Sequence, residues 1–408
     1  MSKLDIDFVR AQFPAFKEPS LQGQAFFENA GGSYTSKFVI DRLNRYYTQR
    51  KVQPYAPYEA SRLAGEEMDE ARVRLAGVLN IPANDLSFGP STTQNTYVLA
   101  QAFRQMLAPG DAIIVTNQDH EANSGPWRCL ADSGIEVREW EVDKDTGFLD
   151  LANLANLLDD KVKLVVFPHV SNIVGQINPV AEICAMAKAV GAVACVDGVS
   201  FAPHGLPDIK ALGADIYLFS AYKTYGPHQG IMYVEADLAM RLPNQGHYFN
   251  ADSPYKRFTP AGPDHAQIAA SAGMVDYIEA VHDHHFDTGG SLAQKARATL
   301  KLQADHEAEL LAPLLEYLRA RNDVRLIGAD KVEARVSTVA IGLKQPGEGV
   351  ARDLAKHGIM AGGGDFYAVR LLEGLGIDPA HGVLRLSFVH YTNAQEVDKL
   401  MKALDQTL

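Results

Sequence analysis

At residues 216–227 the chain reads IYLFSAYKTYGP. The apolar run from Asp215 to Phe219 predicts a buried strand, and a short polar turn after it presents Lys223 just before Gly226-Pro227. Burial removes water from such a lysine and lowers its pKa, because a low-dielectric environment disfavours the charged form. A lysine with a lowered pKa is the nucleophile that forms Schiff bases with carbonyl compounds, including pyridoxal phosphate. The alternative interpretation is a surface lysine that happens to end a strand.

A matching element lies upstream, where residues 192–200 read AVACVDGVS. This continuous apolar run is typical of a central parallel strand buried on both faces, and it ends at Asp197. Ligands of open α/β sheets bind at the carboxyl ends of the strands, so we expect Asp197 and Lys223 at one site. A carboxylate at that site keeps a pyridine nitrogen protonated, which makes the ring a better electron acceptor. An Asp197 that only caps the following helix is the alternative.

Together with the pattern Phe219-Ser220-x-x-Lys223-x-x-Gly226-Pro227, these motifs resemble the class V aminotransferases, a family of fold-type I pyridoxal phosphate enzymes. Within that family the chain is similar to the cysteine desulfurase (SufS-like) and selenocysteine lyase branch. The resemblance extends from residues 27–31 (FENAG) to residues 390–393 (HYTN). It implies an α/β fold, with a mostly parallel seven-stranded-type sheet in a large domain and a smaller C-terminal α/β domain. It also implies a homodimer in which the subunits complete each other's active sites.

The resemblance assigns further cofactor contacts to polar residues that follow predicted strands. Thr92 and Thr93 precede a helical pattern at residues 97–107, where backbone N–H groups and hydroxyls suit the cofactor phosphate; an ordinary helix cap without a ligand is the alternative. His120 is expected to stack on the pyridine ring and to place an acid/base group near the reacting atoms. Asn172 is expected to bond the ring hydroxyl. The expected cofactor-binding set is Thr92, Thr93, His120, Asn172, Asp197, Ser200, Ser220, Tyr222 and Lys223, of which Lys223, His120 and Asp197 are the expected catalytic residues.

The substrate is expected to meet Arg385, in the predicted strand at residues 383–389, because a guanidinium matches a carboxylate with two parallel hydrogen bonds. Asn29 and Tyr367 are the other expected substrate-binding residues. Aromatic residues in the segments 29–34, 55–58, 248–255 and 362–367 favour a bulky or apolar substrate side chain.

The loop before this strand departs from the desulfurase pattern. Desulfurases carry a persulfide-forming cysteine there, whereas residues 358–368 read GIMAGGGDFYA and place Tyr367 at the corresponding position. The cysteines of the chain are Cys129, Cys184 and Cys195, and we interpret all three as small core side chains. A phenol does not carry a persulfide, so the sequence predicts an enzyme that acts at the Cα of an amino acid by lyase or transaminase chemistry. A genuine cysteine desulfurase or selenocysteine lyase, and an amino-acid racemase or epimerase, are the alternatives.

Composition sets the remaining expectations. A chain of 408 residues suggests two domains, here residues 21–284 for the large cofactor-binding domain and residues 285–408, with 1–20, for the small one. Three cysteines and no secretory signal favour a cytoplasmic enzyme. The net charge of −12 disfavours nucleic acid and anionic membranes as partners. The cluster VHDHHFD at residues 281–287 is interpreted as a solvated helix end, and no metal is expected.

Overall fold

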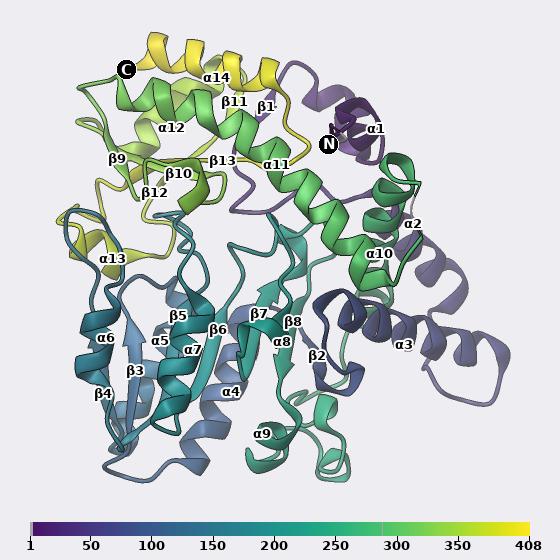
Figure 1. Cartoon of the computed structure of the whole chain (residues 1–408). Helices are drawn as coiled ribbons and strands as arrows, with labels where there is room; N and C mark the ends of the chain where they lie inside the picture. Colours follow the sequence, from purple (N-terminus) through teal and green to yellow (C-terminus); the bar gives the residue numbers. More distant parts are fainter. Residues whose placement is uncertain (1–2, 288) are drawn as a thin grey trace.

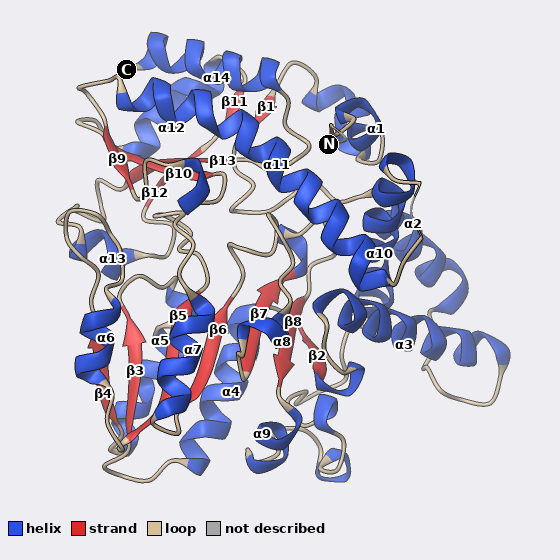
Figure 2. Cartoon of the chain, viewed as in Figure 1, coloured by secondary structure: helices blue, strands red, loops and turns tan. Residues whose placement is uncertain are grey.

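The computed structural model describes residues 3–287 and 289–408. Two α/β parts lie one above the other, and the long helix α11 (Leu292–Arg319) runs diagonally across both (Figure 1). The lower part contains a seven-stranded sheet, and the upper part contains a four-stranded sheet (Figure 2). The expected division into a large and a smaller α/β region is therefore visible in the fold.

The seven-stranded sheet is mostly parallel, as predicted. Only β8 runs antiparallel to its two neighbours. Every residue of the central strands β6 and β7 is buried, because helices cover both faces, and this explains the continuous apolar runs in the sequence. In spatial order the strands are β2 (Leu86–Gly89), β8 (Gly230–Val234), β7 (Ile216–Ser220), β6 (Val193–Asp197), β5 (Val162–Pro168), β3 (Ala112–Thr116) and β4 (Glu136–Trp140).

One of the helices on this sheet, α4, starts earlier in the sequence than predicted. Helix α4 begins at Thr92, not Tyr97, because the Ser91 side chain accepts a hydrogen bond from the Gln94 backbone N–H and caps a first turn of polar residues. The apolar periodicity that marks a helix in a sequence is missing from that turn. The other helices are α5 (Gly125–Arg128), α6 (Leu151–Leu157), α7 (Val180–Ala189), α8 (Ile209–Leu212) and α9 (Ala236–Arg241).

The four-stranded sheet is antiparallel. Its strands in order are β12 (Gly362–Gly364), β13 (Val383–Ser387), β10 (Thr338–Gly342) and β9 (Arg325–Ile327). Gly363 lets this sheet approach α12 (Gly347–Lys356), since a Cβ there would lie 2.1 Å from the Gly347 backbone. Helix α14 (Ala394–Thr407) packs on the same part, and α13 (Val369–Gly374) links β12 to β13.

The N-terminal residues join both parts. Strand β1 (Ala25–Phe26) pairs with β11 (Ile359–Met360), which places residues 25–26 beside the C-terminal part of the chain. Helix α1 (Ile6–Arg10) is tied to the same part by the ion pair of Arg10 with Glu396 (2.8 Å). Helices α2 (Lys37–Arg45), α3 (Glu59–Leu79) and α10 (His265–His285) then pack against one another at the edge of the large sheet. Among the described helices, none is both long and apolar enough to cross a bilayer.

Candidate active site

The predicted site residues meet at the carboxyl ends of β5, β6 and β7. Strand β6 ends at Asp197, β7 ends at Ser220, and Lys223 lies in the turn that follows β7. Two adjoining cavities, of about 60 Å³ and about 490 Å³, open at this edge of the sheet. Both are lined by Thr93, His120, Asn172, Tyr222 and Lys223; the smaller is also lined by Thr92, Asp197, Ser200 and Ser220. The structure thus brings together the whole predicted cofactor-binding set.

Hydroxyl groups gather where α4 begins. The hydroxyls of Thr92 and Ser220 lie 2.8 Å apart, although their residues are 128 positions apart in the chain. Gly230 lets the Ser91–Thr92 backbone pack closely, since a Cβ there would lie 2.4 Å from the Ser91 carbonyl carbon. The first N–H groups of a helix have no partner within the helix and carry partial positive charge, so this corner suits a phosphate.

Lys223 and Asp197 are buried charges that form no ion pair among the described residues. Lys223 is 9% exposed and Asp197 is 6% exposed. Burial, together with the charge of Arg385, lowers the pKa of Lys223 to about 8. Burial also raises the pKa of Asp197 to about 6, although a hydrogen bond from the Val199 N–H (2.8 Å) opposes this. At neutral pH the carboxyl group of Asp197 is therefore ionised, and the amine of Lys223 is neutral in part of the molecules.

His120 and Asn172 present defined polar atoms to the cavities. The Nδ1 atom of His120 accepts a hydrogen bond from the Ala122 N–H (3.0 Å), which leaves the proton of the neutral ring on Nε2. Burial and the nearby Lys223 and Arg385 lower the pKa of His120 to about 3, so the imidazole is neutral. The amide nitrogen of Asn172 donates to the Phe366 carbonyl (3.0 Å), whereas its buried Oδ1 has no partner in the described part of the chain.

These observations fit pyridoxal phosphate. The unpartnered Asn172 Oδ1 suits a ring hydroxyl, the carboxylate of Asp197 suits a ring N–H, and the hydroxyl corner suits a phosphate. Lys223, with its lowered pKa and no counter-ion, suits a carbonyl group. Each polar feature of the cofactor has a counterpart of the right chemistry.

Arg385 lies on β13 and is almost fully buried in the larger cavity. Its Nη2 is 2.6 Å from Glu28 Oε1, and the Phe366 ring covers the guanidinium at 3.8 Å. Gly362 leaves room for this arrangement, since a Cβ there would lie 2.7 Å from Glu28 Oε2. Sequence reasoning missed Glu28 and included Phe366 only as an aromatic residue of the segment 362–367; the three glycines at residues 362–364 were the available sign that other groups pack closely against this loop.

The loop at residues 358–368 bends sharply where Phe366 and Tyr367 line the larger cavity. Phe366 and Tyr367 have φ angles of 51° and 57°, which non-glycine residues adopt only under constraint. Hydrogen bonds supply that constraint: the Tyr367 N–H donates to Asp365 Oδ1 (2.8 Å), and the Tyr367 carbonyl accepts from the Glu121 N–H (2.7 Å). Tyr367 remains 71% exposed, with its ring 5.5 Å from that of His120.

Asn29 and two of the segments expected near the substrate lie outside the linings of the two cavities. Asn29 is buried beside the cavities and accepts a hydrogen bond from the Tyr391 hydroxyl (2.5 Å), while its neighbour Glu28 lines the larger cavity. The segments 55–58 and 248–255 line neither of the two cavities within this chain.

A further buried acid that was not anticipated is Asp119, which precedes His120 in the chain. It accepts hydrogen bonds from Thr116 (2.6 Å) and Asn123 (2.8 Å).

The cysteines lie away from the two cavities. Cys195 is buried in β6 and Cys184 is buried in α7, where burial raises the pKa of the Cys184 thiol to about 12. Cys129 is exposed, which corrects the expectation of a core position, because it faces outward in the turn after α5. None of the three lines the cavities around Lys223 in the described residues.

The histidine cluster at the end of α10 ties down the N-terminus. His284 lies 2.9 Å from Asp5 and stacks on the Phe8 ring at 3.8 Å, and His285 accepts a hydrogen bond from the Asp5 N–H (2.8 Å). Within residues 3–287 and 289–408, no group of three or more metal-binding side chains is placed to hold an ion.

Comparisons with known proteins were made on sequence and on structure. Residues 25–400 match the family Aminotransferase class-V. The chain is 33% identical to the aminotransferase-like protein FGM3 of Gibberella zeae, covering 100% of this chain and 99% of the relative, and 31% identical to a cysteine desulfurase of Serratia proteamaculans, covering 98% of each. Its fold matches the apo cysteine desulfurase of Thermococcus onnurineus with a TM-score of 0.85, 24% identity, and coverage of 100% of this chain and 98% of the other. The cysteine desulfurase CsdA of Escherichia coli follows with a TM-score of 0.81, 24% identity, and coverage of 99% and 98%.

Proposed function

The chain belongs to the class V aminotransferase family and is a pyridoxal-phosphate-dependent enzyme; we propose that it acts at the Cα of an amino-acid substrate without a persulfide-forming cysteine. The observation that carries this proposal is the cavity lining. The larger cavity is lined by Lys223, Arg385, Phe366 and Tyr367 and, among the described residues, by no cysteine. Lyase or transaminase chemistry is the expected outcome.

The residues of the smaller cavity hold and orient the cofactor in this proposal. Thr92, Thr93 and Ser220 bind its phosphate, Asp197 accepts a hydrogen bond from the ring nitrogen, and Asn172 accepts one from the ring hydroxyl. His120, Ser200 and Tyr222 complete the lining. When bound, the cofactor withdraws electrons and stabilises negative charge at the substrate Cα.

Lys223 has two tasks in the proposed reaction. Its neutral form binds the cofactor covalently, and the released amine then takes the proton from the substrate Cα. A pKa of about 8 suits both tasks, because a general base works best with a pKa near the operating pH. His120 lines the same cavities in its neutral form, with its ring 5.5 Å from that of Tyr367.

Arg385 is the proposed partner of the substrate carboxylate. Glu28 and Phe366 hold its guanidinium in one orientation, with an ion pair on one side and a ring face on another. A fixed guanidinium loses little entropy when it binds a carboxylate, so this packing favours tight and specific binding.

Two measurements on the purified holoenzyme test the proposal. Amino acids are screened by the change they cause in the visible absorption of the bound cofactor, and the products are identified for those that react. The enzyme is also incubated with L-cysteine and analysed by mass spectrometry for protein-bound persulfide. We expect no stoichiometric persulfide, and unchanged activity in a Cys129→Ser, Cys184→Ala, Cys195→Ala variant compared with Cys129→Ser alone. Stoichiometric persulfide on one cysteine would support a genuine desulfurase and contradict the proposal.

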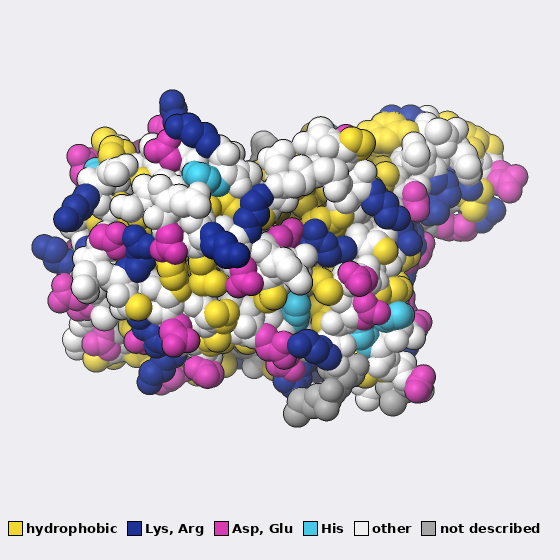
Figure 3. Space-filling model, turned by 90° about the horizontal axis from the view of Figure 1, so that it is seen from above, with side chains coloured by type: hydrophobic (Ala, Val, Ile, Leu, Met, Phe, Trp, Pro, Cys, Tyr) yellow, Lys and Arg dark blue, Asp and Glu magenta, His cyan; other side chains and the backbone are white. Residues whose placement is uncertain are grey.

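A homodimer is proposed on a separate observation. Large aromatic side chains are exposed on the chain at Tyr47, Tyr55, Tyr58, Tyr97, Tyr248 and Phe249. Figure 3 shows hydrophobic side chains on the lobe that projects to the right, on the side where Figure 1 places α3. Exposed apolar patches of this kind mark interaction surfaces. Several of these residues belong to the segments 55–58 and 248–255, which are expected near the substrate but line neither of the two cavities around Lys223. This position is expected if each segment reaches the site of a partner subunit. Light scattering measures the mass directly, and a monomer would contradict the proposal.

A further inference from the structure

A second large cavity lies between the two parts of the molecule, apart from the site of Lys223. Its volume is about 400 Å³, within the range of small-molecule pockets. One wall comes from the loop after β6, at Phe201 and residues 204–207, a second from residues 332 and 335–337, and α11 forms the third. Figure 1 shows α11 crossing from one part to the other. The cavity shares no lining residue with the cavities around Lys223.

Two arginines in this lining form no ion pair among the described residues, although Asp208 acts on Arg297 from beyond contact distance. Arg335 is 4% exposed and donates only to backbone carbonyls, those of Ile327 (3.3 Å), Ala329 (2.5 Å) and Thr338 (2.5 Å), while its Nε has no partner. Arg297 likewise donates only to backbone carbonyls, including that of Val78 (2.6 Å). Burial lowers the pKa of Arg335 to about 10 and also lowers the pKa of Arg297. A buried cation without a partner is costly, so an anion in this cavity would be favoured.

The carboxylate in the lining, Glu307, forms no ion pair with either arginine in the described structure. Its Oε2 lies 2.6 Å from His204 Nδ1 and accepts from the Ser337 hydroxyl (3.1 Å), and its Oε1 accepts from the His390 backbone N–H (3.0 Å). At the rim, Lys301 is paired with Asp305 (2.8 Å). With Arg297, Arg335 and Lys301 against Glu307, the lining carries more positive than negative charge.

Much of the remaining lining is apolar, with side chains such as Ile177, Leu206, Leu300, Val332 and Val336. An inorganic anion would leave these surfaces uncovered, whereas a hydrocarbon or aromatic body would bury them at about 25 cal/mol per Å². We propose that this cavity is a binding site for a small organic anion, a carboxylate with an apolar body.

The site is close enough to the cofactor residues to influence them. Phe201, in the cavity wall, stacks on His169 with 3.7 Å between ring centroids. The backbone N–H of His169 in turn donates to the backbone carbonyl of Asp197 (2.7 Å). A ligand that presses on Phe201 is therefore two contacts from the backbone of Asp197, and its binding is expected to perturb the cofactor absorption.

Octanoate is the probe that tests the proposal, added to the holoenzyme in calorimetric and thermal-unfolding titrations. We expect saturable binding of octanoate with a rise in the unfolding temperature, no binding of 1-octanol at the same concentrations, and at least tenfold weaker binding of inorganic phosphate. No saturable binding of octanoate, or equal binding of either control, overturns the proposal.

Variants on α11 locate the site, and each is compared with its own ligand-free state. Arg297→Gln is expected to weaken octanoate binding about tenfold or more, while Arg297→Lys retains most of it. Ala304→Leu places a larger side chain at the exposed mouth of the cavity and is expected to abolish binding. Arg319→Gln, which removes an arginine of the same helix outside the cavity, is expected to have no effect. Octanoate binding that survives both Arg297→Gln and Ala304→Leu would place the ligand elsewhere, at Arg385 for example, and would refute the assignment.

Discussion

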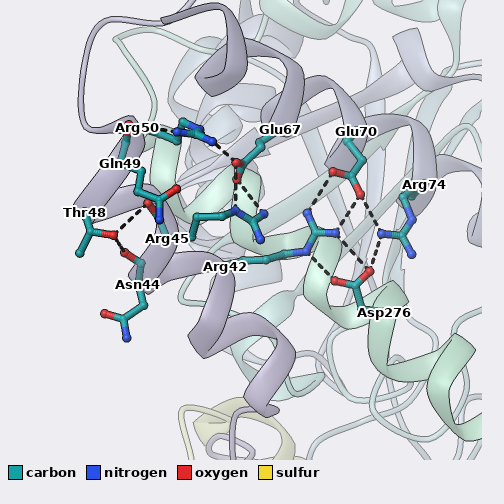
Figure 4. Close-up of polar contacts among 10 residues, drawn as sticks. All are labelled: Arg42, Asn44, Arg45, Thr48, Gln49, Arg50, Glu67, Glu70, Arg74 and Asp276. Carbon is teal, nitrogen blue, oxygen red and sulfur yellow. Dashed lines mark hydrogen bonds and ion pairs between the residues drawn. The ribbon is translucent and has the colours of Figure 1, made fainter. Parts of the chain in front are cut away.

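Two groups of charged side chains in this molecule differ in how they are compensated. Between α2, α3 and α10, Arg42 pairs with Asp276 (2.5 Å) and Glu70 (2.8 Å), and Arg74 pairs with the same two acids (Figure 4). Arg74 also pairs with Glu279. At the ends of β6 and β7, in contrast, Asp197 and Lys223 are buried without an ion pair in the described structure. The first group is a closed network, and the second leaves its charges available to a ligand.

The pKa values of the two groups differ in the corresponding way. Burial alone lowers the pKa of Arg42, but its hydrogen bonds to Glu70 and Asp276 outweigh burial and raise it; the bond from Arg42 lowers the pKa of Glu70. Burial dominates at the other group, where the pKa of Lys223 falls to about 8 and that of Asp197 rises to about 6. The network stabilises charged forms, whereas the site holds groups whose ionised forms are costly until the cofactor binds.

The largest effect is expected for Lys223→Ala. This change removes both the covalent attachment point and the base, so we expect activity to fall by about 10³-fold or more while the protein still folds, because an unpaired buried cation has been removed. Borohydride reduction followed by peptide mass spectrometry should attach the cofactor to Lys223 in the wild type and to no residue in the variant. Full activity, or attachment at another lysine, would remove Lys223 from the proposed role.

Replacing an aspartate by asparagine is expected to stabilise the protein at Asp197 and to destabilise it at Asp276. Asp197→Asn removes an uncompensated charge and keeps an acceptor for the Val199 N–H, so the cofactor-free protein should become more stable at pH 7.5, by at most about 3 kcal/mol for a shift of about two pKa units. Asp276→Asn weakens the pairs with Arg42 and Arg74 and should cost about 2 kcal/mol, less than for a fully buried pair because Asp276 is partly exposed. Thermal unfolding of the cofactor-free proteins measures both.

The stability gain expected for Asp197→Asn also depends on pH. Because the pKa of Asp197 is about 6 in the folded protein and 3.8 for an unperturbed aspartic acid, the folded state binds the proton more tightly. The folded protein therefore loses stability as pH rises from about 4 to about 6, and the advantage of Asp197→Asn should disappear near pH 4. An advantage that persists unchanged to pH 4 would show that burial of this charge is not its cause.

The rate of covalent cofactor capture should follow the ionisation of Lys223. Only the neutral amine attacks a carbonyl group, so with a pKa of about 8 the rate should fall about tenfold for each pH unit below 8 and reach a plateau above it. Mixing cofactor-free protein with pyridoxal phosphate and following the absorbance measures this profile. Asp197→Asn should move the midpoint to lower pH, because the charge of Asp197 raises the pKa of Lys223. A rate that still rises up to pH 10 would indicate an ordinary lysine.

The smallest effect is expected for Arg42→Lys. Lysine keeps the charge but cannot donate to Glu70 and Asp276 through a planar fork, so we expect a loss of about 1 kcal/mol in stability. Cofactor affinity should not change, since Arg42 lies in the network and lines neither cavity around Lys223. Altered cofactor binding in this variant would show that the two charge groups are coupled.

Local patterns were sufficient for much of the fold and for two residues of the candidate site, whereas the other site residues were assigned by the family resemblance. Continuous apolar runs identified β6 and β7, and the residues at their ends identified Asp197 and Lys223. The polar first turn of α4 escaped detection, because a cap formed by Ser91 leaves no apolar periodicity. The specific roles of His120, Asn172 and Arg385 remain predictions, though the structure places all three against the larger cavity.

What the sequence determined by itself was the set of elements and the chemistry at their ends, since hydrophobic periodicity and the position of a polar residue after a strand are local properties of the chain. Only the tertiary structure decided which distant groups meet. Glu28 pairs with Arg385 across 357 positions of sequence, and Phe366 covers the same guanidinium from a loop with strained backbone angles. Tertiary packing likewise placed Arg297 and Arg335 beside a cavity without an ion pair among the described residues. Contacts and desolvation of this kind depend on packing between segments far apart in the chain, and no local pattern of residues encodes them.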